Sequence, residues 1–244
     1  MSDEQPEGDD RSVDIFGLGR IASAIPDRVY ELSASTLVRT FESLLAPITE
    51  TTGGLGRYVR QKFLNMVAAE KAIAVYTIGE AIHKAQERSR KAGISITAPA
   101  STKTFVKAIE EASREDDVVL HEMWANLLAS QLVDQACPPF FVELLSSLGK
   151  PEALILLELL PLEEVGPHVG GYFGIGDYAF THWARQSAGP FRPWSVSCTL
   201  LIQLGLASMV GPFNSDTQNL VLLYRSKLGT AFLGAAAPPA DHGP

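Results

Sequence analysis

Cysteine is scarce in this sequence of 244 residues, and long apolar runs are missing. The two cysteines, Cys137 and Cys198, stand far apart among apolar neighbours, so no disulfide framework or zinc spacing exists. We expect both to be buried free thiols. The longest uncharged run, 193–215, is interrupted by two prolines and two glycines. A membrane span needs about 20 mostly apolar residues, so none is predicted.

Basic residues are fewer than acidic ones. The chain has 20 Lys and Arg against 28 Asp and Glu, for a net charge of −8. Nucleic-acid-binding domains are usually basic, so the bulk composition does not favour that class. Residues 1–14 hold six acids and one base and contain no apolar core of a secretory signal. We therefore expect a disordered acidic tail on a cytoplasmic protein, with peripheral association at the inner face of the membrane as an alternative.

Signatures of catalysis and cofactor binding are incomplete. Residues 17–22 read Gly-Leu-Gly-Arg-Ile-Ala, but the strand–turn–helix context of a dinucleotide-binding loop is missing, so we interpret them as a lead-in to the first helix. His121 begins a near-match to the zinc motif H-E-x-x-H, in which Ala125 stands where the second His is needed. His121 is predicted to be a helix-surface or interface residue, and Trp124 a core anchor. The acidic run 110–117 is expected to be a solvated corner. We predict no catalytic, cofactor-binding or metal-binding residue, and no enzyme.

Apolar residues recur at helical spacing through most of the first 160 residues. The first predicted helix runs from Asp27 to Ala46 and ends before Pro47, because the residue before a proline is driven out of the helical region. The segment 49–56, with Gly53, Gly54 and Gly56, is expected to be a hinge or turn. Further helices are predicted over 57–92 as one long central helix, from 102, over 115–135, after Pro138, and over 150–160, the last buried on most sides.

Charge is divided unevenly between two neighbouring segments. Residues 51–93 hold eight bases and three acids, whereas residues 94–164 hold four bases and twelve acids. The two segments either pack on each other or face opposite ways. Bases near the end of the long helix complement its dipole, but they also offer a surface for an anionic partner, either a nucleic acid or a lipid headgroup. The candidate residues for this surface are Arg57, Arg60, Lys62, Lys84, Arg88, Arg90 and Lys91.

The last third of the chain has a different pattern. A glycine-rich stretch, 165–176, is predicted to be a linker. An uncharged helical segment follows, then two short strands around Gly-Pro-Phe-Asn-Ser-Asp, and then a terminal helix. This order predicts a winged-helix-like module. The predicted strands are 206–210 and 220–224, and the predicted terminal helix is 227–233. We therefore expect a mainly α protein, a helical bundle with one long central helix and a small C-terminal winged-helix-like α+β module. The predicted parts are a tail at 1–14, a helical domain at 15–164, the linker at 165–176, the module at 177–234 and a disordered tail at 235–244.

Three blocks of the sequence, 25–63, 115–148 and 202–233, resemble the abortive infection alpha family in the same order. The middle block carries Trp-Ala-Asn-Leu-Leu and Pro-Phe-Phe-Val-Glu-Leu-Leu, and the last block carries Leu-Gly-Leu and Leu-Gly-Thr-Ala-Phe. The resemblance implies a non-enzymatic bacterial effector of phage defence, toxin-like in action, that works through protein contacts or membrane-surface association. We expect a protein partner and leave open a membrane surface, a nucleic acid and a second copy of the chain. The alternative function is a nucleic-acid-binding regulator that uses the C-terminal module and the basic face of 57–92.

Overall fold

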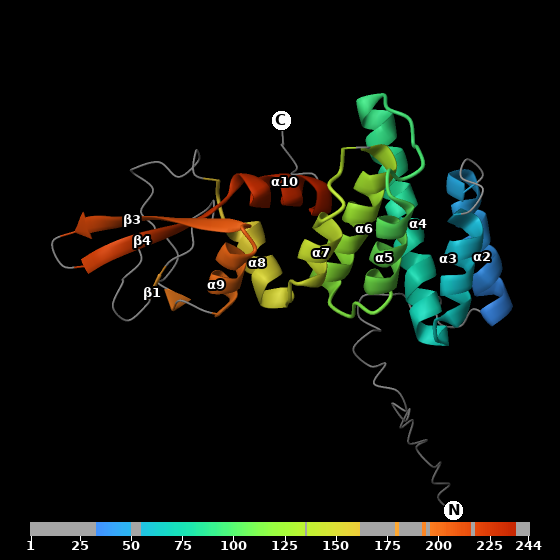
Figure 1. The fold of residues 1–244 in the computed structure, drawn as a ribbon, viewed down its shortest axis with the longest axis horizontal. Helices are drawn as coiled ribbons and strands as arrows, with labels where there is room; N and C mark the ends of the chain where they lie inside the picture. The colour runs from blue at the N-terminus through green and yellow to red at the C-terminus, as the bar shows by residue number, and fades with distance from the viewer. Residues whose placement is uncertain are drawn as a thin grey trace, which may run out of the picture.

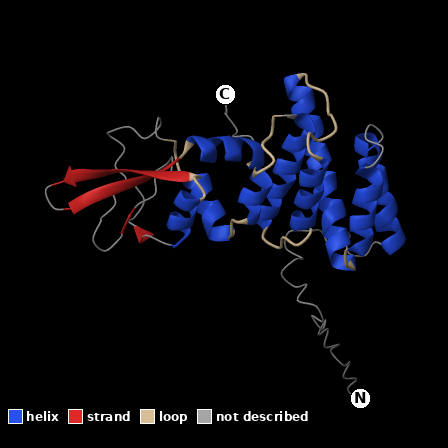
Figure 2. Cartoon of the chain, in the orientation of Figure 1, coloured by secondary structure: helices blue, strands red, loops and turns tan. Residues whose placement is uncertain are grey.

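The computed structural model describes residues 33–49, 55–134, 136–161, 179–180, 192–193, 196–215 and 218–237. Within them the protein is mainly α-helical, as predicted, with a small antiparallel hairpin near the C-terminus (Figures 1 and 2). The helices are α2 (Ala34–Thr49), α3 (Leu55–Asn65), α4 (Ala68–Ala92), α5 (Thr102–Ala112), α6 (Val118–Val133), α7 (Phe141–Ser146), α8 (Lys150–Glu158), α9 (Val196–Gln203) and α10 (Lys227–Ala236). The strands are β1 (Ala179–Phe180), β2 (Arg192–Pro193), β3 (Ala207–Ser215) and β4 (Gln218–Arg225).

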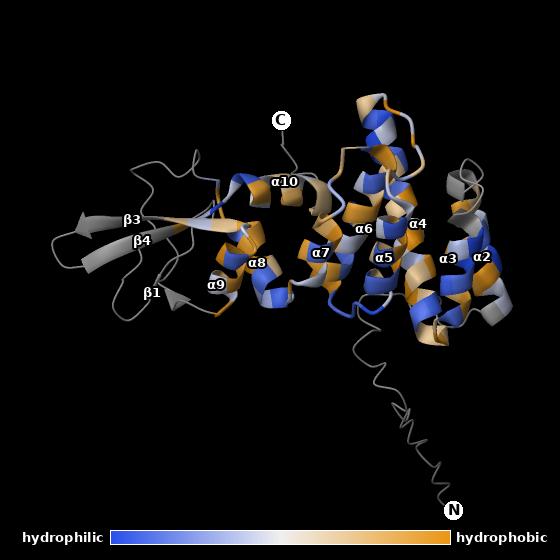
Figure 3. Cartoon of the chain, in the orientation of Figure 1, coloured by the Kyte–Doolittle hydropathy of each residue, from blue (hydrophilic) through white to orange (hydrophobic). Residues whose placement is uncertain are grey.

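The helices form a row, with α2 and α3 at one end and α9 with the β3–β4 hairpin at the other (Figure 1). Helix α6 lies in the middle of the row and packs on α4, α5, α7, α8 and α10. Trp124 of α6 is 2% exposed, so the predicted core anchor is confirmed. Hydrophobic and hydrophilic residues alternate along the helices of the row (Figure 3), and the buried hydrophobic ones form a contiguous core from Leu37 to Ala236.

Side-chain caps explain where several helices begin. Ser101 accepts a hydrogen bond from the N–H of Thr104 at the start of α5. Ser226 does the same for the N–H of Gly229 at the start of α10. Such caps satisfy backbone donors that have no partner within the helix. A glycine explains where α4 ends. Helix α4 stops at Gly93, whose φ of 67° lies in the left-handed region that glycine adopts without strain.

The predicted single helix 57–92 is wrong, because the chain breaks at Met66 and Val67. Glu70 accepts a hydrogen bond from the N–H of Val67 at 3.3 Å, and thereby caps a new helix start. The break allows α3 to pack on α2 (Figure 1), where the rings of Phe41 and Phe63 stack with centroids 3.7 Å apart. Burying this aromatic pair offsets the backbone hydrogen bonds lost at the break.

Two other predicted helix features also need correction. Helix α2 continues through Pro47 to Thr49, because a proline in the last turn removes only one backbone hydrogen bond. Helix α8 is not buried on most sides, since Leu154 and Leu157 are both exposed on one face. Only the opposite face, with Ala153 and Leu156, contacts the core.

The C-terminal part has the predicted order of helix, hairpin and helix. Strands β3 and β4 pair antiparallel from Ala207 opposite Arg225 to Ser215 opposite Gln218, with an irregularity between Val210 and Phe213. Strand β3 is longer than predicted, because the expected turn residues 211–215 belong to it. Strand β4 begins two residues before and ends one residue after its predicted bounds. Helix α10 extends to Ala236, three residues beyond its predicted end. The winged-helix character of this part stays a prediction.

Several predictions lie outside the described residues. They are the acidic tail 1–14, the lead-in 17–22, the start of the first helix at 27–32, most of the 49–56 hinge, the linker 165–176 and the tail from 238 onward.

Candidate interaction surface

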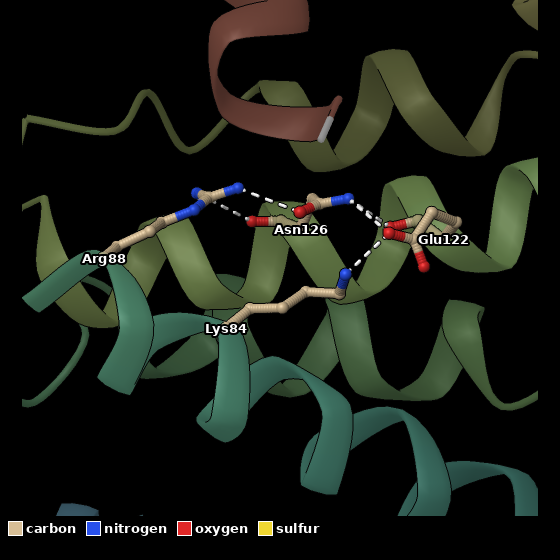
Figure 4. Close-up of polar contacts among 4 residues, drawn as sticks. All are labelled: Lys84, Arg88, Glu122 and Asn126. Carbon is tan, nitrogen blue, oxygen red and sulfur yellow. Dashed lines mark hydrogen bonds and ion pairs between the residues drawn. The ribbon is translucent and has the colours of Figure 1, made fainter. Parts of the chain in front are cut away.

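Two of the predicted surface bases lie in the contact between α4 and α6. The ammonium of Lys84 is 2.6 Å from Oε1 of Glu122, whose other partners include the side chain of Asn126 (Figure 4). Arg88, one turn further along α4, donates from Nη2 to Oδ1 of Asn126 at 2.9 Å. We call the side chains of Lys84, Arg88, Glu122, Asn126 and Ser130 the α4–α6 polar seam.

The seam ends at α10. Nη1 of Arg88 donates to Oγ of Ser130 at 2.5 Å, and that hydroxyl donates to the carbonyl oxygen of Ala235 at 2.7 Å. Burial lowers the pKa of the Arg88 guanidinium, although the nearby Cys137 and Glu122 act in the opposite direction. A charge in this position needs its hydrogen-bond partners. The seam therefore engages both Lys84 and Arg88 in the contact between the helices.

A second buried polar contact joins the same two helices. The hydroxyl of Thr77 donates to the carbonyl oxygen of Ile73 at 2.8 Å and lies 2.7 Å from Nε2 of His121. A hydroxyl has one proton, so Nε2 of His121 is the donor to Thr77. His121 is buried against the ring of Tyr76, and burial lowers its pKa. Of the two predicted positions for His121, the structure thus gives the interface, here between helices of the same chain.

The other five predicted bases lie in two separate groups. Arg57, Arg60 and Lys62 lie on α3, and Arg90 and Lys91 lie in the last turn of α4. The predicted basic face of helix 57–92 is therefore divided, because α3 and α4 are separate helices and Lys84 and Arg88 of α4 contact α6.

Two of the α3 bases have partners within the chain. Nε of Arg60 is 2.7 Å from Oε1 of Glu42 on α2, and Nζ of Lys62 is 2.9 Å from Oε1 of Glu110 on α5. The hydrogen bond and charge of Glu110 raise the pKa of Lys62. The bases at the end of α4 are exposed, as Arg57 is, and none of these three pairs with an acid in the described part of the chain.

The predicted acidic corner has a structural role. Asp117 caps α6 by accepting hydrogen bonds from the N–H groups of Val119 and Leu120, and it pairs with Lys150 at 2.8 Å. Burial pushes the pKa of Asp117 up, but these hydrogen bonds outweigh burial and hold the pKa below its ordinary value. Glu115 accepts from the N–H of Asp117, and burial raises its pKa. The acidic residues 110–117 therefore do not only face solvent: Asp117 and Glu115 also hold the start of α6 in place.

The two cysteines are free and buried, as predicted. Burial raises the pKa of the Cys137 thiol to about 11, so it is almost wholly protonated at neutral pH and is a poor nucleophile. The pocket beside it, lined by residues that include Gln131, has a volume of about 10 Å³, which fits one water molecule and no organic substrate. Among the described residues no group of three His, Cys, Asp or Glu side chains could hold a metal ion.

Sequence reasoning missed the partners of Lys84 and Arg88, although a signal was present. Glu122, Asn126 and Ser130 recur every four residues on α6, and Lys84 and Arg88 have the same spacing on α4. Residues four apart lie on one face of a helix, so the two sets could be recognised as complementary. What the spacing does not give is which two of the helices are neighbours.

Comparison with known families connects the chain to a single family. The abortive infection alpha family matches residues 78–220, which is more than half of the sequence. The chain belongs to this family. The match begins within α4 and ends within β4, so it includes both sides of the α4–α6 polar seam, whereas α2 and α3 precede it. No curated protein and no solved structure matches the chain.

The charge of α9 and the apolarity of the described helices bear on a nucleic-acid and on a membrane partner. Helix α9, the central helix of the predicted winged-helix-like module, contains no charged residue. A helix that reads DNA usually brings Lys or Arg to the phosphates. Among the described residues, no helix combines the length and apolarity needed to cross a bilayer.

Proposed function

We propose that this member of the abortive infection alpha family is a non-enzymatic, toxin-like effector of bacterial phage defence that acts through contacts made at its surface. The observation that carries the proposal is the state of its buried titratable groups. His121 and Arg88 are engaged in hydrogen bonds between helices, and Cys137 is a protonated thiol. Catalytic acids, bases and nucleophiles need a reachable group whose pKa suits the reaction, and these side chains instead stabilise the fold.

The nucleic-acid alternative has less support. Its proposed basic face is divided between α3 and α4, and the seam already engages Lys84 and Arg88. The candidate recognition helix α9 has no base with which to contact phosphates. By contrast, exposed apolar side chains on α3 and α8 are of the kind that surface contacts use.

The proposal is tested by expressing the full chain in a bacterial host, with and without phage. We expect phage yield to fall and infected cells to die when the wild-type protein is present. Single variants Cys137→Ala, His83→Gln and His121→Gln should retain this protection, provided that circular dichroism shows them folded. Loss of protection in a folded variant of one of these residues would indicate a catalytic role and overturn the proposal.

A further inference from the structure

The outer face of α3 has a composition that folding does not explain. Helices α2 and α3 form one end of the row, with α2 outermost in Figure 1. Its inner residues, Val59 and Phe63, are fully buried, whereas Tyr58 is 44% and Leu64 is 47% exposed. Arg57, Arg60 and Leu64 are spaced three, four and seven residues apart, so they share one side of the helix. We call Arg57, Tyr58, Arg60, Lys62 and Leu64 the α3 outer face.

The internal contacts of this face contribute little to stability. The Arg60–Glu42 pair joins side chains that are 61% and 42% exposed, and exposed ion pairs stabilise proteins by at most about 1 kcal/mol. Lys62 lies 5.9 Å from the ring centroid of Tyr58, which keeps a cation beside the exposed aromatic ring. Arg57 and Arg60 can therefore contact external anions at small cost, whereas Lys62 also keeps its 2.9 Å pair with Glu110.

We propose that the α3 outer face binds the surface of an anionic phospholipid bilayer. Helices α2 and α3 together hold four bases and one acid, namely Arg39, Arg57, Arg60 and Lys62 against Glu42. Residues 94–164, which follow α4, are strongly acidic. The positive end of the row is attracted to anionic headgroups while the acidic middle is repelled, which orients the molecule with α3 toward the membrane.

The apolar residues favour a bilayer over a nucleic acid. Nucleic-acid phosphates are bound by lysine and arginine together with polar side chains and backbone N–H groups. None of these contacts uses Leu64 or Val67, the latter 62% exposed at the α3–α4 break. At a membrane interface arginine and lysine reach the headgroups, while Tyr and Leu enter the boundary with the acyl chains. Binding through a few such groups is weak and reversible, and each base contributes about a fivefold gain in affinity.

The test is sedimentation of the full chain with vesicles. Vesicles of phosphatidylcholine with phosphatidylglycerol are compared with vesicles of phosphatidylcholine alone, each at low and at high salt. We expect binding to the anionic vesicles at low salt only, because salt screens exposed charges. Absence of binding to anionic vesicles at low salt would overturn the inference.

Matched variants locate the binding surface. Arg57→Gln/Arg60→Gln removes two charges from α3 and should weaken binding by about 25-fold, from about fivefold for each base. Arg90→Gln/Lys91→Gln removes the same charge from the exposed end of α4 and should leave binding close to that of the wild type. Equal losses in both double variants would show nonspecific attraction and overturn the assignment to α3.

The single variant Leu64→Gln separates a bilayer from other polyanions. It should weaken vesicle binding and leave the salt dependence unchanged, since it removes an apolar contact and no charge. If Leu64→Gln binds as the wild type does, and duplex DNA competes fully with the vesicles, the face is a general polyanion surface and the inference is wrong.

This inference rests on the proposed function, because it names the partner for the surface contacts of the effector, yet the two can fail separately. If the wild-type chain protects cells but does not bind anionic vesicles, only the inference is overturned. If it binds vesicles but a folded Cys137→Ala or His121→Gln variant loses protection, only the proposed function is overturned.

Discussion

The α4–α6 polar seam and the α3 outer face contain the same kinds of residue and use them in opposite ways. In the seam, Lys84 and Arg88 contact complementary groups on α6, and burial raises the value of each hydrogen bond. On α3, Arg57 and Arg60 lie beside the exposed Leu64; Arg60 forms an exposed pair with Glu42, and Arg57 has no acidic partner among the described residues. The difference shows that a basic residue indicates an outside partner only after its neighbours within the fold are known.

The sharpest test of this comparison replaces one aromatic residue in each region. Trp124 is buried in α6, the helix that also carries Glu122 and Asn126 of the seam, whereas Tyr58 is nearly half exposed on α3. We expect Trp124→Ala to lower the free energy of unfolding by about 3–5 kcal/mol, through lost burial and the cavity left behind. Tyr58→Ala should lower it by only about 0.5 kcal/mol, as is typical of surface positions. Urea denaturation measures both, and similar losses would contradict the assignment of Tyr58 to a surface.

Two glycines of α10 test how tightly this helix, which contacts Ser130 at the end of the seam, packs on the rest of the fold. A Cβ at Gly229 would lie 2.1 Å from the carbonyl oxygen of Leu206, a backbone atom that cannot easily move. Gly229→Ala should therefore destabilise the protein by about 1–3 kcal/mol or more. Gly234 has nothing within 4 Å of such a Cβ, so Gly234→Ala should stabilise by up to about 1 kcal/mol. Thermal denaturation of the pair checks the contrast, which would be lost if α10 did not pack against Leu206.

Within the seam itself, Asn126 is the acceptor that Arg88 depends on. Asn126→Leu leaves the half-buried guanidinium without its 2.9 Å partner, and we expect a loss of about 1–3 kcal/mol in the free energy of unfolding. The matched substitution Gln61→Leu on the exposed side of α3 should change it by less than about 0.5 kcal/mol. If Asn126→Leu were neutral in chemical denaturation, the seam would not be a stabilising contact.

The smallest expected effect is a dependence of stability on pH that comes from His121 in the contact between α4 and α6. Burial lowers the pKa of folded His121 below the ordinary value near 6.5, so the unfolded chain binds a proton first. The contribution of neutral His121 to the free energy of unfolding is therefore complete above about pH 6.5, and it is lost as the pH falls toward the pKa of the folded state. Melting temperatures recorded from about pH 7.5 to 5.5 should decline, with a shallower decline in His121→Gln. An identical slope in the wild type and in His121→Gln would contradict this account.

Much of the helical order follows from local signals in the sequence. The end of α4 at Gly93, the start of α5 after Ser101 and the hairpin before α10 all depend on neighbouring residues. The break at Val67 also has a local signal, the acceptor Glu70 three residues later. Hydrophobic periodicity runs across that break, because Phe63 and Ile73 both contact the core. Periodicity alone therefore cannot separate two helices that are buried on similar faces.

The candidate surface was less predictable than the fold for a physical reason. Whether a lysine or arginine is available depends on which helices are neighbours, and this is decided by packing between distant segments. Lys62 and Lys84 look alike in the sequence, yet they pair with Glu110 and Glu122 on two different helices. Net charge per segment left open whether 51–93 and 94–164 pack on each other or face opposite ways, and it could not say which lysines and arginines would pair across them.

The contact between Ser130 and Ala235 also bears on the order in which the protein folds. It joins residues 105 positions apart, whereas the Lys84–Glu122 contact joins residues 38 positions apart. Closing the longer loop costs only about 0.9 kcal/mol more entropy, but it also needs the hairpin before α10 in place. Folding speed falls as contacts become more distant in sequence. We expect α4 and α6 to associate early and α10 to dock last, so in pulse-labelling hydrogen exchange the amides of α6 should gain protection before those of α10, and the reverse order would refute this sequence of events.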